Sequence, residues 1–348
     1  MWVGHSLRLR SRQTLSDVFE FENAGNRQYF GLGYKTNSYG RNTLVAIYLG
    51  IDGGGSKTSC VIGDETSVLG TGTGAASNVV RVGEAQARES LAGAIRQACT
   101  VAHLNPSEIG SACVGLAGAA RPEISELVER IVSELVPGKV EVVGDNVIAL
   151  EAAFGDGPGV IVIAGTGSIA YGRNREGQTA RAGGWGFAIS DEGSGHWIGR
   201  AAVAAALSAR DENPGPDARL IEVLMKSWSL EAFAQLVPVA NATPPPDFAA
   251  LFPAVLSLAE SGDRIAREVL TQAGTHLANL ARTVLRRLFA NGGAVPVAMS
   301  GGVFSSSALV RQVFYNSLRS GNPDVVINPN VIKPVRGALE LARKGAAK

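Results

Sequence analysis

The stretch "AIYLGIDGGGSKTSCVIG", residues 46–63, sets three consecutive glycines between two short apolar runs. Apolar, β-rich runs joined by a glycine turn are typical of a β-hairpin. A turn without bulky side chains exposes backbone N–H groups, which bind anions. Asp52 comes directly before the glycines. The stretch therefore predicts a hairpin whose loop can hold an anion, with one carboxylate at its entrance.

A second stretch, "GVIVIAGTGSIAYGRN" at residues 159–174, repeats this design. After the first hairpin we expect a third strand, a helix over 84–103, a strand, a helix over 122–136 and a strand ending in "VVGD". After the second we expect helices, then the strand "VPVAM", a helix near 305–318, the strand "DVVINP" and a final helix "VRGALELARK". Such a repeat predicts an α/β fold of two duplicated domains, each a sheet covered by helices, with a cleft between them.

Three segments follow from this pattern. Residues 1–43 are polar, rich in Arg, Asn and Gly, and without a sustained period, so we expect a disordered extension outside the fold. Residues 44–157 form the first predicted domain. Residues 158–348 form the second, with a helical insertion at about 190–290. A length of 348 residues fits two domains better than one.

Composition excludes several classes of protein. There are 32 basic and 31 acidic residues and no basic tract, so nucleic acid is not an expected partner. No apolar run reaches the roughly 18 residues of a membrane span, and no signal-peptide core is present. The only cysteines, Cys60, Cys99 and Cys113, are far apart, which predicts buried thiols in a cytoplasmic protein. The four histidines do not cluster, so neither a histidine metal site nor a Ser-His-Asp triad is expected.

Familiar nucleotide motifs do not fit these loops. In "DGGGSKT", Ser56 separates the last glycine from Lys57, which breaks the Walker A pattern. The run "GTGTGA", residues 70–75, does not lead straight into a helix, as a dinucleotide motif requires. Taken singly, the glycines of each loop could have no role beyond forming a tight hairpin turn.

Taken together, the glycine loops predict a polyphosphate held between two domains by backbone amides. A third glycine pair follows the strand "VPVAMS". Asp52 is then placed to hold Mg²⁺, which binds one or two carboxylates, phosphate oxygens and water. The predicted phosphate-binding residues are Gly53, Gly54, Gly55, Ser56, Lys57, Thr58, Gly165, Thr166, Gly167, Ser168, Gly301 and Gly302.

From about Val45 to Arg343 the chain resembles the superfamily of sugar kinases, actin and heat-shock chaperone ATPases. Within it, the chain is similar to the N-acetylglucosamine kinases grouped with the BadF/BadG/BcrA/BcrD ATPases. The resemblance rests on "GIDGGGSKT", "VVGDNVIAL", "IAGTGS", "GGWGFAISDEGSGHWIG" and "SGGV", in this order. It implies two actin-like, ribonuclease H-like domains that use ATP and Mg²⁺, with "SGGV" as the adenosine motif.

The same resemblance implies that Asp145 is the catalytic residue. This aspartate ends the strand "KVEVVG" and could accept a hydroxyl proton as general base. Its alternative role is to cap the helix that follows. The resemblance also implies a sugar site made of Asn78, Gly118, Asp145, Gly184, Trp185 and Asp191. Asp191 could instead cap a helix, and Glu192 would then be a surface acid.

The predicted function is ATP-dependent phosphorylation of the 6-hydroxyl of an amino sugar, N-acetyl-D-glucosamine first. Glucosamine or N-acetylmuramic acid is the alternative substrate, because Ala117 stands where the animal enzymes have serine. An ATPase that activates 2-hydroxyacyl-CoA dehydratases would need closely placed cysteines for an iron–sulfur cluster. A sugar sensor without catalysis would share the fold. By resemblance we also expect a homodimer, with "AGTHLANLARTVLRRLF" as a candidate face.

Overall fold

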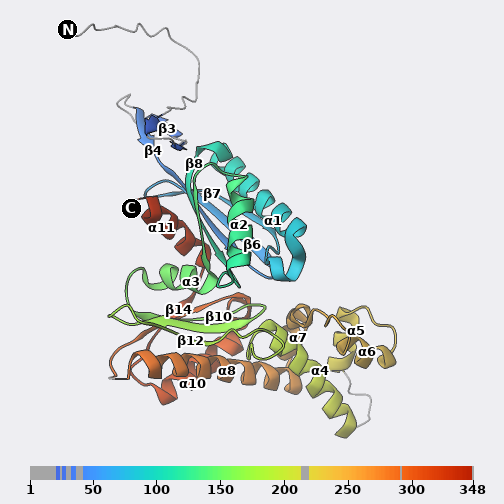
Figure 1. Ribbon diagram of the computed structural model, residues 1–348. Coiled ribbons are helices and arrows are strands. Elements are labelled where there is room, and N and C mark those ends of the chain that lie inside the picture. Colours follow the sequence, from blue (N-terminus) through green and yellow to red (C-terminus); the bar gives the residue numbers. More distant parts are fainter. Residues whose placement is uncertain are drawn as a thin grey trace, which may run out of the picture.

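The structure is a computed structural model that describes residues 21–23, 26–28, 33–36, 42–212, 219–290 and 292–346. Two α/β domains lie one above the other, each built on a five-stranded sheet (Figure 1). The strand order is β7-β6-β5-β8-β9 in the first sheet and β12-β11-β10-β13-β14 in the second. The predicted duplicated α/β fold is confirmed.

In both sheets the first three strands run antiparallel and the last two run parallel to the central strand. The central strands of both sheets are buried along almost their whole length, as expected from the apolar runs of the sequence. The strands of the first sheet are β5 (Ile47–Gly53), β6 (Lys57–Gly63), β7 (Val68–Ala75), β8 (Ile109–Leu116) and β9 (Lys139–Gly144). Those of the second are β10 (Gly159–Ala164), β11 (Ser168–Arg173), β12 (Thr179–Gly183), β13 (Pro296–Ser300) and β14 (Val326–Ile332).

Helices α1 (Val79–Ala102) and α2 (Pro122–Ser133) cover one face of the first sheet. A stripe of glycines on β7 lets α1 lie directly on the strand. A Cβ on Gly70, Gly72 or Gly74 would come within 2.1–2.4 Å of a carbonyl oxygen of α1. The "GTGTGA" motif therefore serves helix–sheet packing, which agrees with its poor fit to a dinucleotide site.

Helix α1 starts earlier than the period of the sequence predicts. Its first residue is Val79 rather than Glu84, and Asn78 accepts a hydrogen bond from Val80 N at 3.1 Å as its N-cap. Gly83 has φ +78° and interrupts the helix with a kink. The kink separates the first turn of α1 from the rest of the helix. Apolar residues recur at helical spacing only after the kink, so the sequence indicated only that part.

The second domain carries the helical insertion. Helix α8 lies along β10, β11 and β12, and the remaining helices of the insertion extend to one side of this sheet (Figure 1). They are α4 (Gly195–Glu212), α5 (Arg219–Ser227), α6 (Leu236–Ala240), α7 (Phe252–Glu260) and α8 (Arg264–Leu288), with 3₁₀ turns at Phe233–Gln235 and Phe248–Leu251. Two more helices follow β13, α9 (Gly302–Ser306) and α10 (Ala308–Gly321). A 3₁₀ turn at Pro106–Glu108 precedes β8.

The last helix, α11 (Pro334–Ala346), packs on the first sheet, although the sequence assigned residues 158–348 to the second domain. This assignment is wrong for α11, because the helix buries Val335, Ala338 and Leu339 against Tyr48 and Val61 of the first sheet. Small residues allow the contact. A Cβ on Gly50 would lie 2.4 Å from Leu339 N, and one on Gly337 would lie 2.0 Å from Ile148 O.

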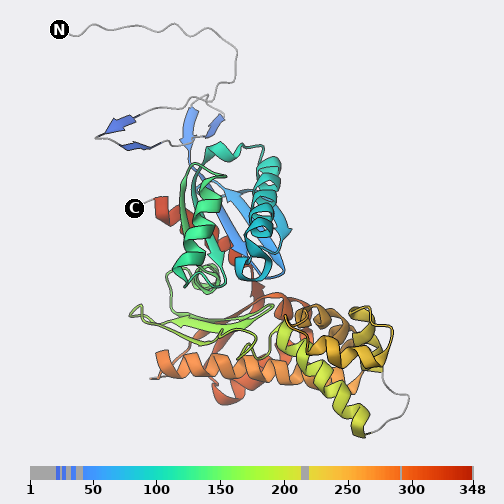
Figure 2. The ribbon, with the colours of Figure 1, turned by 45° about the vertical axis from the view of Figure 1, so that its right-hand side comes forward.

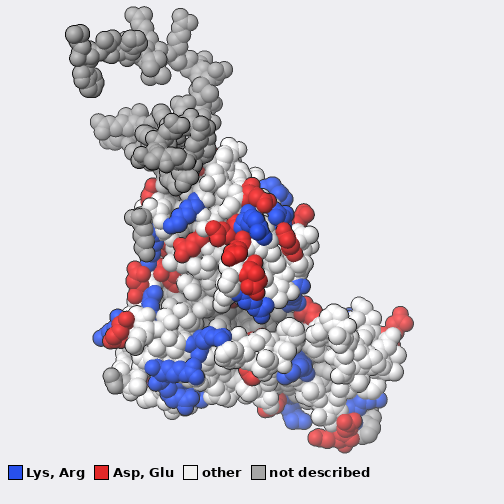
Figure 3. Space-filling view, viewed as in Figure 1, with Lys and Arg blue, Asp and Glu red and all other residues white. Residues whose placement is uncertain are grey.

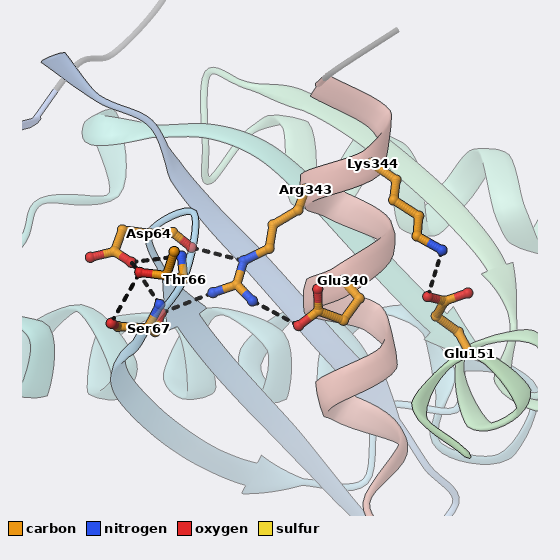
Figure 4. A network of polar contacts seen from close by, with 7 residues as sticks. All are labelled: Asp64, Thr66, Ser67, Glu151, Glu340, Arg343 and Lys344. Atoms are coloured by element: carbon orange, nitrogen blue, oxygen red, sulfur yellow. Dashed lines mark hydrogen bonds and ion pairs between the residues drawn. The ribbon is translucent and has the colours of Figure 1, made fainter. Parts of the chain in front are cut away.

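Polar contacts fix the end of α11 (Figure 4). Arg343 donates through Nε to Asp64 O at 2.8 Å and through Nη2 to Ser67 O at 2.9 Å, both in the β6–β7 turn. Lys344 Nζ lies 2.9 Å from Glu151 Oε1 of α3 (Asp145–Phe154). Helix α3 also packs on β10, so α3 and α11 together join the two domains.

The described residues between 21 and 45 form four short strands, β1 (Phe21–Asn23), β2 (Asn26–Gln28), β3 (Gly33–Thr36) and β4 (Asn42–Val45). They form two two-stranded sheets, and neither pairs with the five-stranded sheets (Figure 2). The rest of the predicted disordered extension lies outside the described residues.

The predicted buried thiols are found: Cys60, Cys99 and Cys113 are free and buried. Burial raises the pKa of Cys99 to about 11 and that of Cys113 to about 12. In the part of the chain that the structure describes, no helix has the length and apolar character needed to cross a membrane. On the face drawn in Figure 3, acidic and basic side chains are interspersed over the first domain. Over part of the second domain, Lys and Arg side chains gather on the same face.

Candidate active site

Two aspartates share one edge of the first sheet. Asp52 in β5 pairs with Gly115 of the parallel strand β8, and Leu116 of β8 pairs with Gly144 of β9. Asp145 follows Gly144 directly. Because the carboxyl ends of parallel strands meet at one edge, the register brings the two carboxylates to the same place, where α/β sheets keep their ligands.

The first glycine loop is a tight turn between β5 and β6. Gly54 N donates to Lys57 O at 3.0 Å, and Gly54 O accepts from Ser77 N and Asn78 N at 3.2 and 3.3 Å. The start of α1 is thereby tied to this loop. Among the described residues, no acceptor is found for the N–H groups of Gly55 and Ser56. These two amides are the free donors that the sequence predicted for an anion.

The second glycine loop is held from behind by α4. Gly165 N donates to Gly167 O at 2.9 Å, while Gly195 N and His196 N donate to Gly165 O and Thr166 O at 2.8 and 3.2 Å. The first amides of α4 therefore bind the loop carbonyls. Within the described chain, the N–H groups of Thr166 and Gly167 have no acceptor.

The two loops touch each other across the domains. Ser56 Oγ and Thr166 Oγ1 lie 2.9 Å apart, although 110 residues separate them in the sequence. The structure thus brings into contact the two hairpins that the sequence identified as equivalent parts of a repeat. Opposed loops with free amides form the kind of nest that binds an anion.

Burial perturbs both aspartates. It raises the pKa of Asp52 to about 7, with the negative charge of Asp145 adding to the effect and Lys57 opposing it. Burial also raises the pKa of Asp145, although Asn146 N donates to its Oδ1 at 2.9 Å. Perturbed pKa values of this kind cluster at functional sites.

The donor set around Asp52 fits Mg²⁺. No hydrogen bond to its carboxylate is found among the described residues, so the oxygens remain available to a cation. The same residues contain no cluster of three or more His, Cys, Asp and Glu side chains that could hold a metal ion. A single carboxylate beside loops with free amides is a donor set that fits Mg²⁺ when the oxygens of a bound phosphate and water complete its coordination.

The alternative capping roles of the aspartates are wrong. Helix α3 begins at Asp145 itself, and its N-cap is Gly144. Helix α4 begins at Gly195, and Ser194 Oγ accepts from Trp197 N at 3.1 Å in the capping position. Neither carboxylate is therefore accounted for as the N-cap of a helix.

Asp191 lies behind the second loop. It is 7% exposed, with φ +73°, and its Oδ1 accepts from Ser168 N at 3.4 Å. Burial raises its pKa, and the N–H groups of Ser168 and Gly186 oppose that rise. A Cβ on Gly167 would lie 3.0 Å from Asp191 Oδ2, so this glycine permits the contact. Glu192, predicted as a surface acid, is partly buried and accepts from Ser190 Oγ at 3.0 Å.

Several predicted site residues have a structural role in this chain. Thr58 is buried, and its Oγ1 lies 2.7 Å from both Ala75 O and Ser77 Oγ. Ser168 Oγ donates to Glu192 O at 2.8 Å. Lys57, the first residue of β6, is exposed. Of these three side chains, only that of Lys57 is open to a ligand.

The remaining predicted residues differ in their surroundings. Gly301 has φ +100°, and its Cβ would lie 2.3 Å from Ala164 O, so only glycine fits there. Nothing lies within 4 Å of a Cβ on Gly302 or Gly118, which are both open. Gly53 is the last residue of β5, and a Cβ at this position would lie 2.9 Å from Ser77 Oγ.

Trp185 is 64% exposed, and the Arg181 guanidinium lies 3.9 Å over its ring. Gly184, with φ +70°, is part of the same exposed loop. The structure therefore places Trp185 on an open surface rather than in a closed pocket.

The sequence reasoning missed Arg81 and Asp247, whose side chains pair at 2.6 Å between the domains. Arg81 comes three residues after Asn78, and this spacing puts it one helical turn from the first loop. That spacing was a usable signal. Asp247 lies in the insertion, and nothing in the sequence marked it.

Comparisons with known proteins find similar chains among the kinases of amino sugars. An N-acetylmuramic acid/N-acetylglucosamine kinase from Clostridium acetobutylicum is 32% identical over 299 residues, which cover 85% of this chain and 97% of the relative. An N-acetyl-D-glucosamine kinase from Dictyostelium discoideum is 31% identical over 311 residues, with coverage of 85% and 97%. A solved structure from Chromobacterium violaceum, proposed to be an N-acetylglucosamine kinase, has a TM-score of 0.66 at 27% identity, over 86% of this chain and 99% of that one.

The profile of the BadF/BadG/BcrA/BcrD ATPase family matches residues 49–342, most of the chain. The matched region begins within β5 and ends within α11, so it includes both glycine loops and both aspartates of the sheet edge. The resemblance expected from the sequence is confirmed. This chain belongs to the BadF/BadG/BcrA/BcrD ATPase family.

Proposed function

We propose that this protein is an ATP-dependent kinase that phosphorylates the 6-hydroxyl of N-acetyl-D-glucosamine. The observation that carries the proposal is the contact between the two glycine loops, with Asp52 and Asp145 at the adjoining sheet edge. Phosphoryl transfer needs a positioned γ-phosphate, neutralised charge and an acceptor hydroxyl in line. Two loops with free amides supply the first, and a half-buried carboxylate supplies a base.

In this reaction the amides of Gly55, Ser56, Thr166 and Gly167 hold the phosphates. The sugar O6 forms a bond to the γ-phosphorus while the bond from that phosphorus to the β–γ bridging oxygen breaks. Asp145 accepts the O6 proton, and ADP leaves. Asp52 would hold Mg²⁺, which would supply neutralisation of the phosphate charge.

The sugar would bind between Asn78 and Asp145, beside Gly118. Asn78 N donates to Gly54 O of the first loop, so the side chain starts close to the phosphate nest. Its Oδ1 caps α1, and its amide nitrogen remains a donor for a sugar hydroxyl. Asp191 supports the second loop from behind, and Gly184 and Trp185 would shape the outer side of the sugar site.

N-acetylmuramic acid is the second candidate substrate. The Clostridium acetobutylicum relative is named for both sugars, and it matches 85% of this chain. Glucosamine remains an alternative from the sequence. An activator of 2-hydroxyacyl-CoA dehydratases is not favoured, because the three cysteines are buried and free. A sensor without catalysis is not favoured either, because Asp52 and Asp145 are both in place.

The place of action and the assembly are also proposals. Free buried thiols fit the reducing cytoplasm. A homodimer through α8 would use its polar face, because Leu277, Ala281 and Leu285 of this helix are already buried within the domain. Light scattering of the purified chain measures its mass and decides between monomer and dimer.

The activity test is ADP release with N-acetyl-D-glucosamine, N-acetylmuramic acid, glucosamine and glucose, each with Mg²⁺ and ATP. We expect the highest kcat/KM with N-acetyl-D-glucosamine. Asp145→Asn should keep the fold and ATP binding but lower kcat by about 10²- to 10⁴-fold, the contribution of a positioned general base. Asp324→Asn, at an exposed carboxylate, is the matched control. A folded Asp145→Asn variant with near-normal kcat would refute the base assignment, and no ADP release with any of the four sugars would refute the kinase.

A further inference from the structure

An arginine stands where the two glycine loops meet. Arg81 Nη1 lies 3.6 Å from the position that a Cβ on Gly55 would take, and Thr166 Oγ1 lies 3.3 Å from the same position. One end of the guanidinium therefore borders both phosphate loops. Its side chain is 33% exposed, so it remains accessible from solvent.

The other end of the same guanidinium is held by the second domain. Arg81 Nη2 lies 2.6 Å from Asp247 Oδ2, just before the 3₁₀ turn Phe248–Leu251 of the insertion. A guanidinium is a planar fork with donors on both sides. Asp247 can therefore fix one nitrogen while the other faces the loops, and it can do so only when the domains are together.

The charges around this point call for a cation. Asp52 and Asp145 are both acidic, and a nucleotide brings further negative charge to the loops. Lys57 is the positive side chain that acts on Asp52. Phosphoryl transfer is catalysed largely by positioning and by electrostatic stabilisation of charge on the transferred group.

We propose that Arg81 binds the γ-phosphate of ATP and stabilises its charge during transfer, and that Asp247 positions Arg81 when the domains close. This inference rests on the proposed kinase function. It adds a residue of the first domain, carried by α1, to the phosphate site. It also makes the site complete only in the closed arrangement, which couples closure to catalysis.

Two other roles for Arg81 compete with this one. It could form only a surface ion pair, which contributes little. It could also bind an acidic substituent on the sugar, because Asn78, a candidate sugar residue, lies one helical turn away. The first role predicts no effect on ligands, and the second predicts an effect confined to the sugar.

The test compares two nucleotides that differ at the γ-position. AMP-PNP and ADP, each with Mg²⁺, are titrated calorimetrically into the wild-type chain and into Arg81→Gln and Arg81→Lys. Arg81→Gln should weaken AMP-PNP binding by about 10- to 100-fold, the usual effect of losing a charged hydrogen bond. ADP binding should change little. Arg81→Lys should recover part of the loss, because it keeps the charge but not the fork.

Arg88→Gln on the same helix is the matched control, because within the described chain Arg88 pairs only with Glu84 and Glu134 of its own domain. It should leave both affinities unchanged. Asp247→Asn should weaken AMP-PNP binding less than Arg81→Gln does. Thermal unfolding of every variant checks that the fold is retained.

Equal losses for AMP-PNP and ADP in Arg81→Gln, or no loss for either, would overturn the proposal. So would an unchanged AMP-PNP affinity together with a raised KM for N-acetylmuramic acid alone, which would assign Arg81 to the sugar. The calorimetric comparison does not require turnover. A wild-type chain without kinase activity would therefore refute the proposed kinase function. The calorimetric titrations would still measure the role of Arg81 in γ-phosphate binding.

Discussion

At the scale of single residues, two requirements on the protonation state of Asp52 conflict. Its position beside the phosphate nest suits a magnesium ligand, which must be ionised. In the protein without ligands, burial and the neighbouring Asp145 raise its pKa to about 7, so the carboxylate takes up a proton well above its ordinary range. Mg²⁺ bound beside the carboxylate would favour the ionised form and lower the pKa again, because its positive charge stabilises the carboxylate. When Asp52 is ionised in the protein without ligands, its buried charge therefore destabilises the folded state, and binding of the cation removes this destabilisation.

This leads to a prediction for stability against pH. The folded state binds more protons than the unfolded state between the ordinary pKa of 3.8 and about 7, so stability should fall as pH rises through this window. Asp52→Asn removes the charge. It should raise the free energy of unfolding at pH 8 by up to about 4 kcal/mol, the equivalent of the pKa shift.

Urea unfolding without Mg²⁺ or nucleotide, at pH 4, 6 and 8, measures this effect. The difference between Asp52→Asn and the wild type should grow with pH and be smallest at pH 4. Asp324→Asn, at an exposed carboxylate, should give a difference that does not grow. A constant difference for Asp52→Asn would show that its charge is not under strain in the folded protein.

The positions of the candidate site residues along the strands could be predicted from the sequence, but their hydrogen-bond partners could not. Asp52 and the glycine loops could be located because they end strands of a repeated design, whereas Asp145 was identified by the family resemblance and by its place at the end of a predicted strand. Thr58 and Ser168 were predicted to bind phosphate, but their hydroxyls already form hydrogen bonds with neighbouring groups of the protein. Local sequence cannot reveal such partners, since they come from other elements brought close by folding.

At the level of elements, the contact between α1 and β7 decides how the first domain packs. Gly70, Gly72 and Gly74 share one face of β7, since side chains alternate along a strand. Each would push α1 away if it carried a Cβ. The sequence predicted both the strand and the helix, but the glycines were first weighed as a nucleotide motif. Only the position of the helix above the strand explains them.

Gly72→Ala should therefore destabilise the protein strongly. The added Cβ would lie 2.1 Å from Ala94 O, and backbone cannot yield as a flexible side chain does. Overpacking of this type typically costs about 1–3 kcal/mol. Gly93→Ala, inside α1 with its nearest neighbour 4.0 Å away, is the control and should stabilise by about 0.5–1 kcal/mol. Chemical denaturation measures both, and an unchanged stability for Gly72→Ala would mean that the helix can shift freely.

At the level of the whole molecule, the chain crosses twice between the domains. Helix α3 leaves the first sheet and packs on β10, and α11 returns from β14 to cover β5. The sequence predicted both helices but placed α11 in the second domain, because order along the chain was the only guide. The partner of a terminal amphipathic helix is set by surfaces that fold elsewhere, here Tyr48, Val61 and Cys113.

This double crossing predicts that the two domains unfold as one cooperative unit. Leu339 of α11 is 1% exposed and packs in the first domain, so Leu339→Ala should cost about 2–5 kcal/mol there. Trp185, Trp197 and Trp228 all belong to the second domain. In a Trp2→Phe background, tryptophan fluorescence therefore reports the second domain alone, while far-UV circular dichroism reports both.

With cooperative domains, Leu339→Ala should lower the urea midpoint equally by fluorescence and by circular dichroism. Leu277→Ala, at a buried position of α8, is the matched control in the second domain and should lower the fluorescence midpoint whether or not the domains are coupled. A fluorescence midpoint that Leu339→Ala leaves in place, with a second transition by circular dichroism, would mean that the domains unfold independently. In that case α3 and α11 would connect the domains without stabilising one through the other.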